Sequence, residues 1–411
     1  MLRFFYSIGI YLLGLVLQVF SFFNPKIKLG VVGRRNTFSI LKQSISQTDK
    51  TIWMHCASLG EYEQGLPVLQ ALKIKYPKHK IVVSFFSPSG YEIKKNSTDI
   101  DVAIYLPLDT KKNAKQFLDL AHPELILFVK YEIWPNILLE AKKRGITSLL
   151  ISATFRKGQS YFKWYGSLMR KALFSFDHIF TQDENSKELI KKIGYSSVSV
   201  SGDTRFDRVS HQLKIDNTID FIETFKADKT TIVFGSSWPA DDALFIPFIN
   251  ENHNDLKFII APHNIKPSYI NYIEERLKVP TVKFSNMKGK ILSEYSAFIL
   301  DTIGYLGKTY SYADIAYVGG AAGNTGLHNV LEPAVFGIPI IIGKNYSKFP
   351  EAKQLIELNG IVSTETKEDF KKTISHLVEN VNKRHAQGAI NSKFIENNQG
   401  AVVHILDFIR I

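Results

Sequence analysis

The stretch IWMHCASLGEYEQGLPVLQALKIK, residues 52–75, decides the fold class. Residues 52–56 form a short apolar run around His55, as in a strand buried on both faces of a sheet. The small residues after it, with Gly60, predict a turn, and residues 64–75 have helical spacing. Glu61 stands where this helix is expected to begin. The stretch therefore predicts a strand, a loop with an acidic residue and a helix, the repeating unit of a parallel α/β sheet.

The same unit recurs along the chain, which predicts doubly wound parallel sheets. Further helices are expected at 110–121 and 136–143, the second ending near Gly145. Strands are expected on both sides of a polar stretch that runs from Asp203 to Lys229. The expected strands before it are 52–56, 81–86, 103–106, 125–129, 148–152, 178–181 and 198–201, and those after it are 231–235, 257–261, 297–300, 315–319 and 339–343.

The polar stretch marks a domain boundary, because 411 residues exceed the usual span of one hydrophobic core. Two Rossmann-like sheets joined there are expected to enclose a cleft, with ligands at the carboxyl ends of the strands. The final residues are apolar enough for a helix that packs back onto one of the domains. The expected parts are an anchor helix at 1–25, a first domain at 26–205, a linker at 206–229, a second domain at 230–390 and a C-terminal helix at 391–411.

The N-terminal segment from Phe4 to Phe23 is apolar and carries no charge over about 20 residues, which is enough to cross a bilayer as a helix. Basic residues follow it at once, at positions 26, 28, 34 and 35, which places the rest of the chain on the cytoplasmic side. Cleavage is not expected, since no small-residue site ends the segment. Spanning and interfacial anchors both stay open, and a buried first helix of the domain is the alternative.

The formal net charge of +12 suits nucleic acid, anionic lipid or a phosphorylated substrate. Because no aromatic-and-basic RNA motif, zinc-finger spacing or Walker loop is present, nucleic acid is not expected as a partner. The single cysteine, Cys56, cannot form an internal disulfide and is expected as a packed core thiol. The histidines His55, His263 and His328 lack metal-site spacing, so no metal is expected.

Three charged residues are candidates for chemistry in the first domain. Glu61 could act as a general base, or could simply favour the start of a helix. Glu132 follows the strand expected at 125–129 and could support the base, bind an acceptor or pair with Arg205. Arg205 offers a bidentate contact to phosphate or carboxylate, with a surface arginine as the alternative.

The glycine-rich stretch GGAAGNTGLHNVLEPA at residues 319–334 is the strongest binding signal in the second domain. A helix starting near His328 would aim its free amides at a phosphate, and Glu332 could accept hydrogen bonds from ribose hydroxyls. The pattern is not a dinucleotide fingerprint, so NAD is not expected. Loops around Ser236 and Ser237, Pro262 and His263, and 301–304 offer further small residues and donors after strands.

The order of these motifs resembles that of the 3-deoxy-D-manno-octulosonic acid (Kdo) transferases of lipopolysaccharide synthesis, over nearly the whole chain. Residues 58–61, Ser-Leu-Gly-Glu, are similar to the family's Ser-Val-Gly-Glu loop, which makes Glu61 the implied base. Glu132 matches the family's glutamate before Leu-Trp-Pro, and Arg205 replaces a lysine before Phe-Asp. The resemblance assigns both to transition-state stabilisation.

The resemblance also implies a set of CMP contacts, although two loops depart from the family's pattern. Residues 262–264 read Pro-His-Asn where the family has Pro-Arg-His, and residues 303–305 read Ile-Gly-Tyr where it has Met-Gly-Glu. The implied contacts are Ser236, Ser237, Pro262, His263, Ile303, Gly304, Tyr305, Asn329, Val330, Leu331 and Glu332.

What the resemblance implies as a whole is a GT-B fold, with two Rossmann-like domains facing a cleft and an N-terminal anchor. Its implied activity is inverting transfer of Kdo from CMP-Kdo to a lipid A precursor, without a metal or other cofactor, at the cytoplasmic face of the inner membrane. The first domain would take the acceptor and the second the donor. The alternatives are another GT-B sugar transferase with a lipid acceptor, or a catalytically inactive membrane scaffold.

Overall fold

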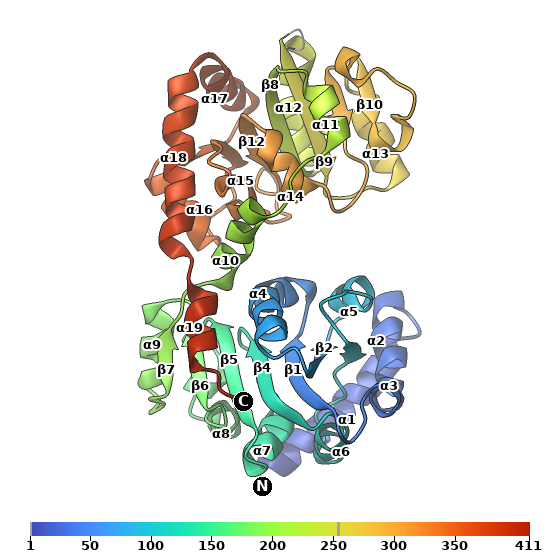
Figure 1. Ribbon diagram of the computed structural model, residues 1–411, viewed down its shortest axis with the longest axis vertical. Helices are drawn as coiled ribbons and strands as arrows, with labels where there is room; N and C mark the ends of the chain where they lie inside the picture. The colour runs from blue at the N-terminus through green and yellow to red at the C-terminus, as the bar shows by residue number, and fades with distance from the viewer. Residues whose placement is uncertain (1, 253–254) are drawn as a thin grey trace. The chain divides into compact units, whose positions relative to one another are not determined.

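The computed structural model describes residues 2–252 and 255–411. The chain forms two compact units, one of Met1–Arg208 with Gln399–Ile411 and the other of Val209–Asn398. Each unit is built on a seven-stranded sheet, and every strand pair is parallel. Helices cover the sheets in both units (Figure 1). The predicted doubly wound α/β fold class is therefore confirmed.

The sheet of the first unit has the strand order β3-β2-β1-β4-β5-β6-β7. The seven strands expected from the sequence are confirmed, with small shifts at their ends. The strands are β1 Lys50–Cys56, β2 His79–Phe85, β3 Val102–Tyr105, β4 Pro123–Val129, β5 Thr147–Ala153, β6 His178–Thr181 and β7 Val198–Val200. The helices are α1 Leu2–Phe20, α2 Pro25–Arg35, α3 Thr37–Ser44, α4 Leu59–Lys75, α5 Pro88–Lys94, α6 Lys111–Ala121, α7 Pro135–Lys143, α8 Ser167–Leu173, α9 Glu184–Lys191 and α19 Ala401–Phe408.

Both faces of this sheet are buried, as the unbroken apolar runs predict. Along β1, Trp53 packs into one core, and Met54 packs into the core on the opposite face. Phe128 and Leu127 of β4 divide between the same two cores. Since successive side chains of a strand point to opposite faces, alternation of this kind fixes the register of each strand. Cys56 is fully buried and free, as expected of a core thiol.

Helix α1 is the N-terminal apolar segment, and Ile10 is its only buried residue among those described. A buried first helix is therefore the wrong alternative, because most of the helix's large apolar side chains are exposed. By length and composition α1 could cross a membrane. The helix ends before Asn24, whose side chain caps α2, and Pro25 occupies the first turn of α2.

The C-terminal segment returns to the first unit, where α19 lies against β6 and α4. Ile405 and Ile409 enter the core beneath α4, and the ring of Phe408 contacts His178 of β6 with centroids 4.5 Å apart. The Asp207 carboxylate accepts the backbone N–H groups that begin α19. The final residues are thus part of the structure that carries Glu61.

The polar stretch from Asp203 to Lys229 is largely helical, which its weak pattern did not indicate. Helix α10 spans Thr204–His211 and α11 spans Asp220–Lys226. Their few apolar residues account for this, because Phe206 and Phe225 are buried.

The sheet of the second unit has the order β10-β11-β9-β8-β12-β13-β14. The five strands expected here are confirmed, and the two edge strands, β10 and β14, were not predicted. The strands are β8 Thr230–Ser237, β9 Leu256–Pro262, β10 Thr281–Lys283, β11 Ala297–Ile299, β12 Ile315–Val318, β13 Ile340–Gly343 and β14 Ile361–Thr364. The other helices are α12 Pro239–Glu251, α13 Pro267–Glu274, α14 Leu306–Thr309, α15 Leu331–Ala334, α16 Pro350–Glu357, α17 Lys367–Glu379 and α18 Val381–Asn398.

Candidate active site

The two candidate carboxylates of the first unit follow neighbouring strands. After β1 the chain builds outward to β3 and then returns to place β4 on the other side of β1. Such a reversal of strand order leaves a crevice at the carboxyl ends of the two central strands, where α/β proteins bind ligands. Glu61 follows β1 and Glu132 follows β4. The topology therefore brings both residues to the position where a site is expected.

Glu61 lies in the first turn of α4 and is 6% exposed. The predicted turn at Gly60 is wrong, because α4 already begins at Leu59 and Gly60 belongs to the helix. The Glu61 carboxylate accepts the backbone N–H of Ala57, which ties it back to the end of β1. Burial, and next the charge of Glu132, raise the pKa of Glu61 to about 7. A carboxyl group with this pKa is suited to proton transfer near neutral pH.

Glu132 is held by an aromatic neighbour in the loop after β4. The indole Nε1–H of Trp134 donates to Oε2 of Glu132 over 3.0 Å. Lys130, at the start of this loop, has a left-handed backbone with φ of 66°. A residue other than glycine rarely adopts this conformation, and such strain is concentrated at functional sites.

His55 supports the same group from inside the sheet. It is fully buried, and its Nδ1 lies 3.1 Å from the carbonyl oxygen of Ser84, so Nδ1 carries the proton. Its Nε2 is then an acceptor and lies 3.2 Å from Nε1 of Trp134. The Trp134 N–H is therefore shared between His55 and Glu132. The histidine thus has a hydrogen-bonding role beside Glu132.

Arg205 lies at the start of α10, and its guanidinium pairs with Asp203 at 2.8 Å. The preceding Thr204 donates to the carbonyl oxygen of Gln64, in α4, over 2.6 Å. Arg208 pairs with Glu63 of α4 at 2.9 Å. Helix α10 is therefore fixed to α4, the helix that carries Glu61. Glu63 forms ion pairs with Lys94 and Arg208, so it is a structural residue rather than a candidate base.

In the second unit, the glycine-rich loop after β12 lies beside the loop after β8, since these two strands are neighbours. Asp241 of α12 joins the loops: its carboxylate accepts the N–H groups of Trp238, Gly320 and Ala322. Gly320 has φ of 96°, and a Cβ there would meet the carbonyl oxygen of Gly326 at 2.0 Å. Only glycine fits this position, so the loop has one well-defined conformation.

Three rings gather around these loops. The indole of Trp238 stacks on His263 with ring centroids 4.6 Å apart, and His263 contacts His328 at 4.4 Å. The Trp238 Nε1–H donates to Nε2 of His328 over 3.0 Å. Burial, and next the charge of His263, lower the pKa of His328 to about 4, so this nitrogen is free to accept at neutral pH. Flat rings of this kind suit a nucleobase or a sugar.

The prediction that a helix starts near His328 is wrong. Helix α15 begins only at Leu331 and has four residues. Pro333 within it cannot supply a backbone N–H, and Gly337, with φ of 68°, follows in the turn that ends the segment. Asn329 organises the turn instead, because its side chain accepts from Leu331 N–H and donates to Glu332.

The other predicted binding residues lie at strand ends of the second unit. Ser236, with φ of 56°, and Ser237 end β8, and Pro262 ends β9. Ile303 is 81% exposed beside Gly304, whose φ is 99°. Tyr305 packs instead among other aromatic rings. Among the described residues, no group of three or more His, Cys, Asp or Glu is placed to hold a metal ion.

Comparison with known proteins bears on this arrangement. Residues 32–208 match the family model for 3-deoxy-D-manno-octulosonic-acid transferase (kdotransferase), which lies within the first unit. The 3-deoxy-D-manno-octulosonic acid transferase of Haemophilus influenzae is 26% identical, with 87% of this chain and 86% of that protein covered. That of Aquifex aeolicus is 29% identical, with 78% and 83% covered. The chain is similar to the Kdo transferases. The resemblance expected from the motif order is thereby confirmed.

The fold of this chain is also found in solved structures. The UDP-GlcNAc 2-epimerase of Neisseria meningitidis matches with a TM-score of 0.61 and 14% identity, over 87% of this chain and 98% of that one. At this identity the likeness concerns the fold alone. The two parallel-sheet units are those of the GT-B fold, as expected.

One contributor to the candidate site, Asp241, was missed in the sequence. It carried a usable signal, since an acidic residue three positions after Trp238 is typical of helix capping. The hydrogen bonds of Trp134 carried no such signal, because only the fold brings its indole between Glu132 and His55.

Proposed function

We propose that the chain transfers Kdo from CMP-Kdo to a sugar hydroxyl of a lipid A precursor, with inversion, in lipopolysaccharide synthesis. The names of its relatives, which it matches over most of their length, support the donor sugar and the reaction class. In this proposal residues 26–205 take the acceptor, residues 230–390 take the donor, and no metal or other cofactor is needed.

One observation carries the proposal: the Glu61 carboxyl group is buried beside Glu132 and has a pKa of about 7. A surface glutamate would be ionised at neutral pH but would be a weaker base. Burial makes the ionised form of Glu61 a better proton acceptor without leaving it fully protonated. The N–H of Ala57 holds Oε2 of Glu61 in place, so the proposed base has a fixed position.

In the proposed reaction, ionised Glu61 takes the proton of the acceptor hydroxyl. The hydroxyl oxygen forms a bond to the anomeric carbon of Kdo from the face opposite the phosphate. The bond between that carbon and the phosphate oxygen breaks, and CMP leaves with the electron pair. Arg205 would stabilise the charge on the departing phosphate.

The exposed apolar side chains of α1 support a place at a lipid surface, which we propose to be the cytoplasmic face of the inner membrane. An acceptor embedded in lipid is met most readily by an enzyme already at that surface, because the search is confined to two dimensions.

The test is incubation of the full chain with CMP-Kdo and a tetraacylated lipid A precursor, followed by mass spectrometry of the lipid. An increment of one or more Kdo residues supports the proposal, and the number of increments gives the number transferred. Release of UDP from UDP-sugars in place of CMP from CMP-Kdo would identify another GT-B transferase. Biological activity that survives Glu61→Gln unchanged would identify a scaffold.

A further inference from the structure

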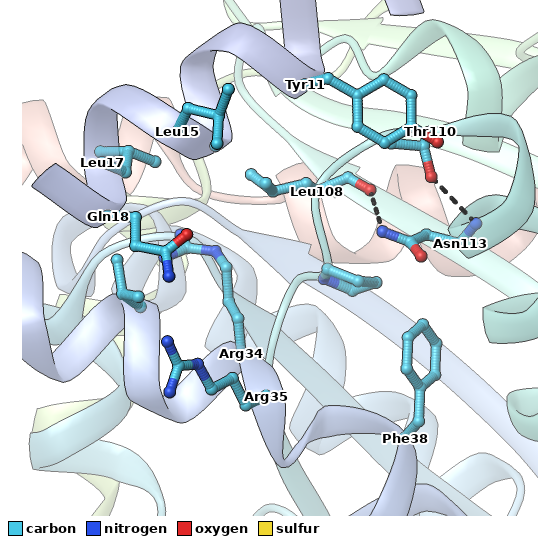
Figure 2. Close-up of a pocket in the computed structure, with 13 residues that line it drawn as sticks. Tyr11, Leu15, Leu17, Gln18, Arg34, Arg35, Phe38, Leu108, Thr110 and Asn113 are labelled. Atoms are coloured by element: carbon cyan, nitrogen blue, oxygen red, sulfur yellow. Dashed lines mark hydrogen bonds between the residues drawn. The ribbon is translucent and has the colours of Figure 1, made fainter.

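Two neighbouring pockets lie along α2, and Arg34 and Val31 line both of them. The first, about 450 Å³, lies between α1 and the segment that follows β3. The second, about 640 Å³, lies between α2 and the segment that follows β2. Figure 2 shows Tyr11, Leu15 and Gln18 of α1 around the first pocket, with Arg34 and Arg35 on the side of α2.

Arg34 is a half-buried cation without a counter-ion. Its guanidinium donates to the carbonyl oxygens of Leu106 and Phe86, and its central carbon lies 4.3 Å from the centre of the Phe86 ring. Among the described residues no carboxylate forms an ion pair with it. Burial lowers the pKa of Arg34 to about 10. Since an uncompensated buried charge is costly, the site is suited to a bound anion.

Much of the rest of the lining is hydrocarbon, and the carboxylate that lines the second pocket, Glu92, is paired with Lys95 and accepts from Tyr105. Leu15 and Leu17 of α1 contribute to the first pocket, and Ile27 and Leu29 of α2 contribute to the second. An exposed lysine, Lys26, stands at the edge of the second pocket. A free inorganic anion would make no use of these walls. An amphiphile would, with its anionic group at Arg34 and its chain along α1.

The second pocket is connected to one candidate catalytic carboxylate, Glu132, through two aromatic rings. The Phe86 ring, on which Arg34 lies, stacks on Trp134 with centroids 5.2 Å apart and a 30° angle between the ring planes. Trp134 in turn donates to Glu132. A ligand held at Arg34 is therefore separated from Glu132 by two stacked rings, which suits a substrate better than a remote structural lipid.

We propose that these pockets hold a phosphate group and one acyl chain of the acceptor lipid, with Arg34 as the partner of the phosphate. The class of ligand, a phosphorylated and acylated lipid, follows from the pocket chemistry. Its identification with the acceptor rests on the proposed function.

Binding can be tested with the full chain in phosphatidylcholine nanodiscs to which a bisphosphorylated, tetraacylated lipid A precursor is added, by native mass spectrometry of the retained lipid. Arg34→Gln should weaken retention about tenfold, as loss of one charge-assisted contact does. Lys28→Gln removes an exposed cation of the same helix that lines neither pocket, and it should leave retention unchanged. Val31→Phe should weaken retention by filling both pockets, while Arg34 stays in place.

Competition identifies the source of the ligand. Displacement of the precursor by inorganic phosphate at equal concentration would overturn the proposal, because it would show that the site does not recognise an acyl chain. Displacement by phosphatidic acid at equal concentration would also overturn it, because it would show that the site does not select the acceptor lipid. Equal retention by Arg34→Gln and Lys28→Gln would overturn it as well. A thermal melt of each variant separates loss of binding from loss of folding.

Catalysis separates this proposal from the proposed function. Arg34→Gln should raise KM for the lipid about tenfold and leave KM for CMP-Kdo unchanged. If the wild-type chain forms no Kdo-lipid product yet retains the precursor through Arg34, transfer fails and the pocket stands. If product forms and neither variant changes the acceptor KM, the pocket alone is disproved.

Discussion

Glu61 and Glu132 follow the two neighbouring central strands of one sheet, and the charge of Glu132 contributes to the raised pKa of Glu61. The ionisation of the proposed base is therefore set partly by a residue from a different strand and loop.

Replacement of the base is the most direct test. Glu61→Gln keeps the size of the side chain and an oxygen for the Ala57 N–H, but it cannot take a proton. We expect the transfer rate to fall at least about a hundredfold, in the range of lost general base catalysis. CMP-Kdo binding, measured by calorimetry, should stay within about twofold. A variant that keeps more than a few per cent of the rate would exclude Glu61 as the base.

The pH dependence of transfer should report the same group. Because Glu61 works in its ionised form, kcat should rise with pH and level off above about 7. Glu132→Gln removes the charge that raises the pKa of Glu61, so the midpoint of the rise should move to lower pH. Glu63→Gln is the matched control, since Glu63 is paired with Lys94 and Arg208 and should leave the midpoint in place.

A buried base should also affect stability. The pKa of Glu61 is raised in the folded protein, so the folded state keeps a proton that the unfolded chain releases above pH 4.5. Stability therefore falls as pH rises from about 4.5 to 7, by about 3 kcal/mol for this group. Glu61→Gln should be more stabilising at pH 8 than at pH 5, as measured by urea unfolding at both values. An equal effect at both would show that burial does not shift this pKa.

The donor loops depend on one carboxylate, so Asp241→Asn should weaken CMP binding at least about tenfold, because its amide cannot accept from all the N–H groups now bound. Calorimetry with CMP measures this. Asp242→Asn is the control: Asp242 is equally buried on α12, but its carboxylate accepts from Tyr269 rather than from the glycine-rich loop. A similar loss of affinity in both variants would point to general destabilisation of α12.

The glycine-rich loop should be intolerant of a side chain at one position. Gly320→Ala places a methyl group against the carbonyl oxygen of Gly326 in a left-handed backbone. We expect a loss of about 1–3 kcal/mol of stability, together with weaker CMP binding. Gly307→Ala, in α14, meets nothing within 4 Å and should change neither.

Sequence was sufficient for most of the strands, because a strand buried on both faces reads as an unbroken apolar run. The two strands that were missed, β10 and β14, are edge strands of three and four residues. Thr281 and Lys283 are half-buried at one edge, so no apolar run marks that strand. Edge strands need fewer apolar residues, and their pattern is correspondingly weak.

The site was predictable where its residues follow strands, as Glu61 and Glu132 do. The start of the helix near His328 was not predictable, because the same small and turn-forming residues occur in a glycine-rich loop and at the start of a helix. Only the structure shows that the helix is confined to the short segment around Pro333, before Gly337. The partnership of Trp134 with His55 joins positions far apart in the sequence, and no local pattern encodes it.

The return of α19 to the first unit has a consequence for biosynthesis. Ile405 and Ile409 complete the core beneath α4, yet they follow the entire second unit in the sequence. Folding of the amino-terminal half during translation must therefore pause in an incomplete state until the entire second unit has been synthesised. A premature stop codon near residue 399 would spare every candidate catalytic side chain. It would still remove the segment that completes the core of the first unit.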